Sequence, residues 1–234
     1  MSNQGIEKIL EDCRQIYKLH KPKLEQKFTN FNDFCFNLNR YTFQPMNEER
    51  YLIKGRRKER AVMSLNILER KINLNTKFLQ DAKDKCYQMT GSIRYHLHLN
   101  YGILHECFHV LIAGLDPEHY IGNSKYTDIK EAAADFFTIN YLKDYCRLAL
   151  EKLKEKQEID TLSDDEKKKL PLQQNWFKIL KRCVVNGERL YLGGKFGRRS
   201  SFYFAKLSHI FKKNSYDGVM EALRNPEALR KQVV

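Results

Sequence analysis

Residues 104–111 read LHECFHVL, and this short stretch carries the sharpest pattern in the chain. His105 and His109 stand four residues apart, so on a helix they lie one above the other on the same face. Glu106 lies roughly 100° farther around such a helix. The apolar residues fall at helical spacings around these three: Leu104, Cys107, Phe108 and Leu111. The stretch therefore predicts a buried helix that carries two histidines and a glutamate.

The spacing of the two histidines suits a metal ion. Two neutral imidazoles one turn apart can bind a single Zn²⁺ at about 2.0–2.1 Å. Glu106 is too far around the helix to be an easy third ligand, but it is near enough to hold a metal-bound water. The pattern H-E-x-x-H is the signature of zinc hydrolases, in which the glutamate is the general base. The alternative is a helix with two hydrogen-bonded core histidines, and burying that set without a metal is costly.

A catalytic zinc site needs a third protein ligand and an open fourth position. Residues 131–137 read EAAADFF, and the first of them stands 22 residues after the second histidine. Glu131 and Asp135 share one helix face, and the small residues 132–134 would let this helix approach the first one closely. Two structural alternatives stay open. Asp128 and Glu131 fit a capping box, and Asp135 fits a solvated face.

The two motifs together resemble those of the gluzincin metallopeptidases. In that class a glutamate on the next helix completes a His₂Glu zinc site, and an aspartate four residues later supports a ligand histidine. The resemblance implies Zn²⁺ as the cofactor, with His105, His109 and Glu131 as metal ligands. It implies Glu106 as the catalytic residue and Asp135 as the hydrogen-bond partner of a ligand imidazole.

Within the gluzincins, the chain is most similar to the ImmA/IrrE-type peptidases. The similarity lies in the apolar-flanked H-E-x-x-H and in a following helix of the form E-x-x-A-x-x-F-A, and it covers residues 60–150. There are departures. Phe108 stands where a glycine is common, Asp135 stands where an asparagine is common, and the Leu-x-Pro ending is missing. The resemblance implies an α+β, mostly helical fold: a zincin-like core with a small sheet beside the H-E-x-x-H helix.

The competing third ligand is His119, ten residues after the second motif histidine. A metzincin arrangement is excluded, because Ile112 and Leu115 stand where its glycine and third histidine belong. SprT/Spartan-like proteases also use a later histidine, usually next to a glycine. In this chain His119 is flanked by Glu118 and Tyr120 instead. His119 and Tyr120 are therefore candidates to line the cleft.

The net charge of +13 is unevenly distributed. Residues 101–150, which carry the motifs, have 4 basic and 7 acidic side chains, a balance of −3 that suits a cation site. The basic excess flanks this segment, with clusters at 54–60 and 195–199. Such clusters can meet nucleic acid, a membrane surface or an acidic substrate. They are equally compatible with an ordinary lysine-rich, soluble surface.

The chain shows the composition of an intracellular protein. Its six cysteines are scattered without a C-x-x-C pair, so we expect reduced thiols rather than a disulfide framework. The N-terminus has no apolar signal core, and the apolar runs are far shorter than the roughly 20 residues that span a bilayer. We therefore expect a cytoplasmic location and no membrane span.

The length of 234 residues suits one sizeable domain, or one domain with an appendage. Residues 1–157 form the zincin-like core with N-terminal helices, 158–171 form a charged linker, and 172–234 form a helical C-terminal part that completes the domain. Within the core we expect, in chain order, a helix over 4–19, a break at Lys21-Pro22, a helix over 23–41 and extended chain over 60–80. Residues 92–113 then lead into and include the motif helix, followed by a loop over 114–127 and a helix over 128–157.

These observations predict a zinc-dependent endopeptidase that hydrolyses peptide bonds of an intracellular protein, with Glu106 as general base. The oxyanion donor is left open among five residues: Tyr120, Tyr126, His119, His209 and Arg198. Two other functions also stay open. One is a nucleic-acid-associated, Spartan-like protease that binds through its basic flanks. The other is a non-catalytic binding module with a structural metal, against which the intact Glu106 argues. The oligomeric state is not predicted.

Overall fold

The computed structural model describes residues 3–28, 40–46, 51–54, 57–60, 63–81, 93–157 and 198–231. Within these ranges the fold is α+β and mostly helical, with a small three-stranded mixed sheet. The predicted linker over 158–171 and the segment 29–39 of the predicted second helix lie outside the described residues. So do the side chains of both basic clusters, at 54–60 and 195–199.

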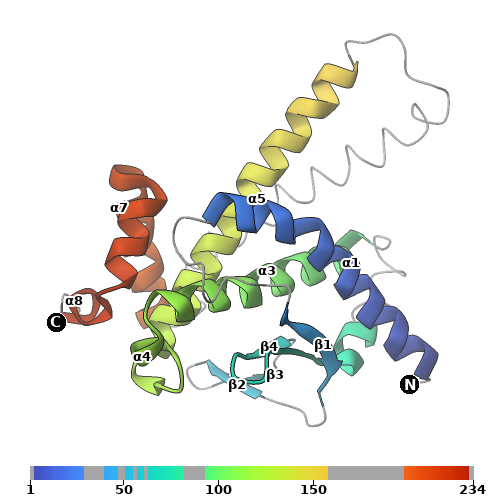
Figure 1. Ribbon diagram of the computed structural model, residues 1–234, viewed down its shortest axis with the longest axis horizontal. Helices are drawn as coiled ribbons and strands as arrows, with labels where there is room; N and C mark the ends of the chain where they lie inside the picture. The colour runs from blue at the N-terminus through green and yellow to red at the C-terminus, as the bar shows by residue number, and fades with distance from the viewer. Residues whose placement is uncertain are drawn as a thin grey trace.

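The helices form a layer around α3, the helix that carries the H-E-x-x-H motif. In chain order they are α1 (Asn3–Phe28), α3 (Ile93–Leu115), α4 (Pro117–Tyr120), the 3₁₀ helix η3 (Ser124–Tyr126), α5 (Thr127–Gln157), α7 (Arg198–Leu223) and α8 (Pro226–Lys231). Helix α3 packs against both α1 and α5, and α5 packs against α7. Figure 1 shows the small sheet below α3 and most of α5 above it. The helix α3 therefore lies in the centre of the fold.

Helix α1 runs without interruption through Pro22, so the predicted break at Lys21-Pro22 is wrong. A proline inside a helix removes the hydrogen bond to the carbonyl four residues earlier. Here Pro22 and Lys18 are both exposed, so that carbonyl lies on the solvent side, where water can satisfy it. The opposite face of α1 is apolar and fully buried at Ile9 and Phe28.

The sheet has the strand order β1-β5-β4, built from β1 (Thr42–Pro45), β5 (Lys71–Leu74) and β4 (Met63–Asn66). Strand β5 pairs in parallel with β1 and antiparallel with β4. A separate antiparallel pair joins β2 (Tyr51–Lys54) and β3 (Arg57–Arg60). The extended chain predicted over 60–80 is confirmed for β4 and β5, whereas residues 76–81 are helical.

A glycine brings the sheet close to α3. A Cβ placed on Gly102 would lie 3.0 Å from both Sδ and Cε of Met63, which is tighter than nearly all real Cβ contacts. Gly102 thus leaves room for the end of the Met63 side chain, which extends from β4 to α3 one turn before the motif. The edge strand thereby comes next to the H-E-x-x-H residues.

Small and aromatic side chains hold α3 against α5. Residues 132–134, all alanine, have no exposed surface, and they permit the close approach predicted for this helix. Phe108 of α3 stacks on Phe137 of α5 with ring centroids 5.3 Å apart. Helix α7, on the other side of α5, bends at Ser215, whose φ of 57° and ψ of −158° are not helical. Among the described residues, no helix is long and apolar enough to cross a membrane.

Candidate metal centre

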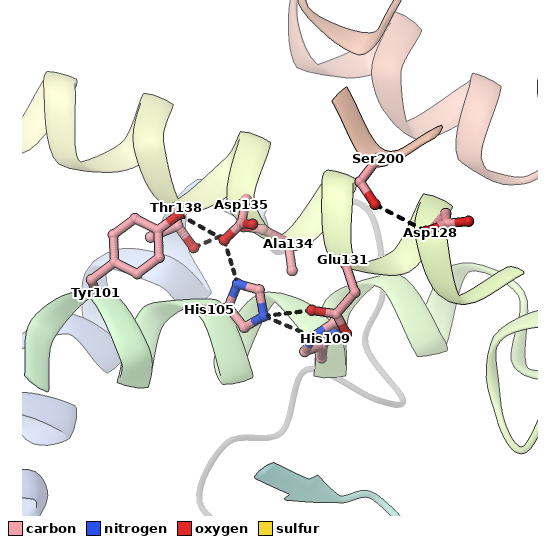
Figure 2. Close-up of polar contacts among 9 residues, drawn as sticks. All are labelled: Tyr101, His105, His109, Asp128, Glu131, Ala134, Asp135, Thr138 and Ser200. Carbon is pink, nitrogen blue, oxygen red and sulfur yellow. Dashed lines mark hydrogen bonds and ion pairs between the residues drawn. The ribbon is translucent and has the colours of Figure 1, made fainter. Parts of the chain in front are cut away.

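Two neighbouring helices supply the side chains of the candidate site. Helix α3 carries His105, Glu106 and His109, and α5 carries Glu131 and Asp135. Figure 2 shows Glu131 reaching from α5 toward both histidines. The two imidazoles are 14% exposed and the Glu131 side chain is 34% exposed, so the group is half-buried but open on one side.

The donor atoms of His105, His109 and Glu131 converge on one point. The Nε2 atoms of the two histidines are 3.0 Å apart. The Glu131 carboxylate lies 3.3 Å from Nε2 of His105 through Oε2 and 3.4 Å from Nε2 of His109 through Oε1. A tetrahedral Zn²⁺ with bonds of about 2.0–2.1 Å holds its ligand atoms about 3.3 Å apart. The group could therefore hold one metal ion. Three ligands on a tetrahedral ion leave the fourth position for a water or a substrate.

The charges in the group are strongly coupled. Burial alone would raise the pKa of the Glu131 carboxyl, but the imidazoles of His109 and His105 outweigh it and hold that pKa well below its usual value. Burial alone would lower the pKa of His105, but the carboxylates of Asp135 and Glu131 outweigh it and hold that pKa well above its usual value. The site therefore keeps the Glu131 carboxylate ionised and attracts a positive charge, either a proton or a metal ion.

Asp135 holds His105 from the side away from the converging donors. Nδ1–H of His105 donates to Oδ1 of Asp135 at 2.7 Å. A carboxylate only accepts, so this contact places the proton on Nδ1 and leaves the lone pair of Nε2 for a metal ion. Asp135 is only 6% exposed, so the alternative that placed it on a solvated face is wrong.

Glu106 is almost fully buried, with 6% of its surface exposed. Burial raises the pKa of its carboxyl, and the imidazoles of His109 and His105 offset part of that rise. The backbone N–H of Leu65, in β4, donates a hydrogen bond to it. The carboxyl group therefore lies between the motif helix and the edge strand, next to the two imidazoles.

The structure does not bring His119 and Tyr120 into the converging group. His119, on α4, has its Nδ1 2.7 Å from Oδ2 of Asp116. The Tyr120 side chain is buried, with its hydroxyl donating to the carbonyl oxygen of Leu223 at 2.8 Å. That hydroxyl is thus engaged at the contact with α7, away from the imidazoles.

Three other candidate oxyanion donors remain. Two of them lie elsewhere in the fold, and the side chain of the third is outside the described part of the chain. The Tyr126 hydroxyl donates to the carboxylate of Glu227, which also pairs with Lys125. His209 is exposed on α7. The side chain of Arg198 is outside the described part of the chain.

The sequence did not draw attention to Tyr101. Its hydroxyl donates to Oδ1 of Asp135 at 2.6 Å, the same oxygen that binds His105 (Figure 2). The one available signal was the spacing, because Tyr101 stands four residues before His105 and so shares its helix face.

A further contact fixes the start of α5. Ser200, in the first turn of α7, donates to Oδ1 of Asp128 at 3.0 Å. Asp128 is thus bonded to another helix, and the Glu131 carboxylate faces the imidazoles. Asp128 and Glu131 therefore do not form the capping box that was the alternative. The contact with Ser200 anchors the turn from which Glu131 projects.

Comparison of the chain with known protein families, curated proteins and solved structures finds no match. The function is therefore argued from the geometry of the site.

Proposed function

We propose that the chain is a zinc-dependent endopeptidase that hydrolyses peptide bonds of protein substrates. The observation that carries this proposal is the convergence of His105, His109 and Glu131 at separations of 3.0–3.4 Å, with a buried carboxylate at Glu106 beside them. Two histidines, one carboxylate and an open position are the ligand set of many catalytic zinc sites.

The metal would be held by Nε2 of His105, Nε2 of His109 and the carboxylate of Glu131. Zinc bound there would act as a Lewis acid, polarising the scissile carbonyl and lowering the pKa of a water. The Nδ1–H bond from His105 to Asp135 keeps one imidazole in the required tautomer and orientation.

Glu106 would move the protons of the reaction. Its carboxylate accepts a proton from the attacking water and later delivers it to the leaving amine. A base works best when its pKa is near the working pH, and burial shifts the pKa of Glu106 upward in that direction. The backbone N–H of Leu65 donates a hydrogen bond to the same carboxyl group.

The test is a digestion of a proteome-derived peptide mixture, with new termini identified by mass spectrometry. The full chain is compared with Glu106→Gln, which keeps the size of the side chain but cannot accept the proton. Glu118→Gln is the matched control, because this glutamate is exposed on α4. We expect new termini with the unaltered chain and with Glu118→Gln, and their loss with Glu106→Gln and after chelation.

Cleavage that persists in Glu106→Gln would overturn the catalytic assignment. A chain that binds zinc through these ligands but cleaves nothing, under conditions in which Glu106→Gln behaves identically, would favour the non-catalytic binding module.

A further inference from the structure

We propose that Tyr101 is a positioning residue for the metal site, because its hydroxyl fixes Asp135 and, through Asp135, the ligand His105. The inference rests on the metal site of the proposed function, but it does not require that the chain cleaves peptides.

The geometry places two donors on one oxygen. The Tyr101 hydroxyl donates to Oδ1 of Asp135 at 2.6 Å, and Nδ1–H of His105 donates to the same atom at 2.7 Å. Figure 2 shows the carboxylate between the phenol and the imidazole. A rotation of the Asp135 side chain that breaks one of these bonds disturbs the other. Since Asp135 is only 6% exposed, there is little water to replace either donor.

The three residues form a bridge between the two ligand-bearing helices. Tyr101 and His105 are one turn apart on α3, with ring planes at 20° and centroids 6.3 Å apart, whereas Asp135 belongs to α5. Burial and the neighbouring carboxylate raise the pKa of Tyr101 well above its usual value, so the hydroxyl keeps its proton and remains a donor.

For the metal ion, the consequence is that the ligand His105 is held in one orientation. With Oδ1 held by Tyr101, Asp135 keeps the Nδ1–H tautomer of His105 and aims Nε2 at the point shared with His109 and Glu131. Without the hydroxyl, the carboxylate gains a free rotamer, and the imidazole must be ordered again each time a metal ion binds.

The first experiment measures the zinc affinity of the full chain by competition with a chromophoric chelator. Tyr101→Phe removes only the hydroxyl, and we expect zinc binding about 3- to 10-fold weaker, the effect of one hydrogen bond. The matched control is Tyr141→Phe. Tyr141 is a buried tyrosine on α5, and its hydroxyl bonds to His20 at 3.1 Å, away from the metal ligands. We expect that variant to bind zinc as tightly as the unaltered chain.

A double-mutant cycle separates positioning from a general loss of structure. If Tyr101 acts through Asp135, then Tyr101→Phe should have no further effect on zinc affinity in the Asp135→Ala background. An effect of Tyr101→Phe that is equally large in both backgrounds would overturn the proposal, and so would an unchanged zinc affinity in the single variant.

A measurement on the unaltered chain covers the case in which Tyr101→Phe does not fold. In the zinc-loaded protein, the Tyr101 hydroxyl proton should give a slowly exchanging NMR resonance that is lost in Asp135→Ala. The absence of that resonance from the unaltered, folded protein would overturn the proposal. A chain that binds no zinc overturns the metal site itself, whereas one that binds zinc but cleaves nothing leaves the role of Tyr101 intact.

Discussion

His105 and His109 face each other through their Nε2 atoms at 3.0 Å, close to the spacing of two ligands on one tetrahedral zinc ion. Two imidazoles in this arrangement can share at most one proton between the facing nitrogens. A cation between them satisfies both lone pairs at once, and Glu131 adds a negative charge to the same point.

We therefore expect the purified chain to carry about one zinc ion, because one group of three donors converges among the described residues. Elemental analysis should show its loss in His105→Ala and in His109→Ala. His119→Ala should keep it, because that imidazole faces Asp116. Full zinc occupancy after removal of either motif histidine would contradict the site.

Substitution of Glu106 should separate metal binding from turnover. Glu106→Gln should retain zinc and the thermal unfolding midpoint, since the amide fills the same buried space. Hydrolysis of a peptide identified in the digestion experiment should fall by a factor on the order of 10²–10⁴ or more. A turnover number close to that of the unaltered chain would place the base elsewhere.

The role of Glu131 as a metal ligand can be tested against the alternative that it only caps α5. As a ligand, its replacement in Glu131→Ala should weaken zinc binding strongly. As a cap alone, its replacement should cost about 1 kcal/mol of unfolding free energy and leave zinc in place. Asp128→Ala is the control, because it loses the contact with Ser200 at the same end of α5 but faces away from the metal ligands. Zinc titration and thermal unfolding distinguish the two roles. Zinc lost in His119→Ala but retained in Glu131→Ala would instead favour a Spartan-like site.

Asp135→Ala should weaken zinc affinity or activity about 10- to 100-fold, the usual effect of removing a carboxylate that orients a ligand histidine. The imidazole of His105 then loses its partner at Nδ1 but keeps Nε2 near the other ligands. Competition with a chelator measures the change directly. An affinity equal to that of the unaltered chain would show that His105 is oriented by its packing alone.

His20 should make the metal-free chain sensitive to mild acid. It is 1% exposed, with its ring nitrogens 3.1 Å from the Tyr141 hydroxyl and 2.6 Å from Oδ1 of Asn100. Burial lowers its pKa below the model-peptide value of 6.5, so the unfolded chain takes up the proton first. Stability is therefore lost as the pH falls below about 6.5, toward the lowered pKa of the folded state.

The control for this prediction is His20→Gln, which does not titrate. Denaturant unfolding of both metal-free proteins between about pH 7.5 and 5.5 should show a smaller loss of stability in the variant. Equal losses in the two proteins would mean that His20 does not contribute to the acid sensitivity.

The parts of the fold that follow from local spacing were the most predictable. The motif helix expected within 92–113 is α3 (Ile93–Leu115), and the helix expected over 128–157 is α5, which begins one residue earlier and ends at the same residue. Within each helix, a three- or four-residue spacing fixes which side chains share a face, whatever the rest of the chain does. The pairs His105 with His109 and Glu131 with Asp135 were visible for that reason.

The rest of the fold and of the candidate site depended on how separate helices and strands pack against one another. Strands of four residues, such as β1 and β2, are too short for an alternating pattern to distinguish them from loops. The shared oxygen of Asp135 requires the relative placement of α3 and α5, so the role of Tyr101 could not be read from either helix alone. The sequence predicts a break at Pro22, because the solvent exposure of the carbonyl that loses its hydrogen bond is a property of the folded chain.

The division of the ligands between α3 and α5 has a mechanical consequence. An ion bound by His109 and Glu131 cross-links two helices that the chain joins only through α4 and η3. Such a cross-link exists only in the folded state, so at a free zinc concentration of about 100 times the dissociation constant it would add about 2.7 kcal/mol to the unfolding free energy. A chelator would then remove this cross-link from the centre of the molecule and leave the chain more open to unfolding and to proteolysis.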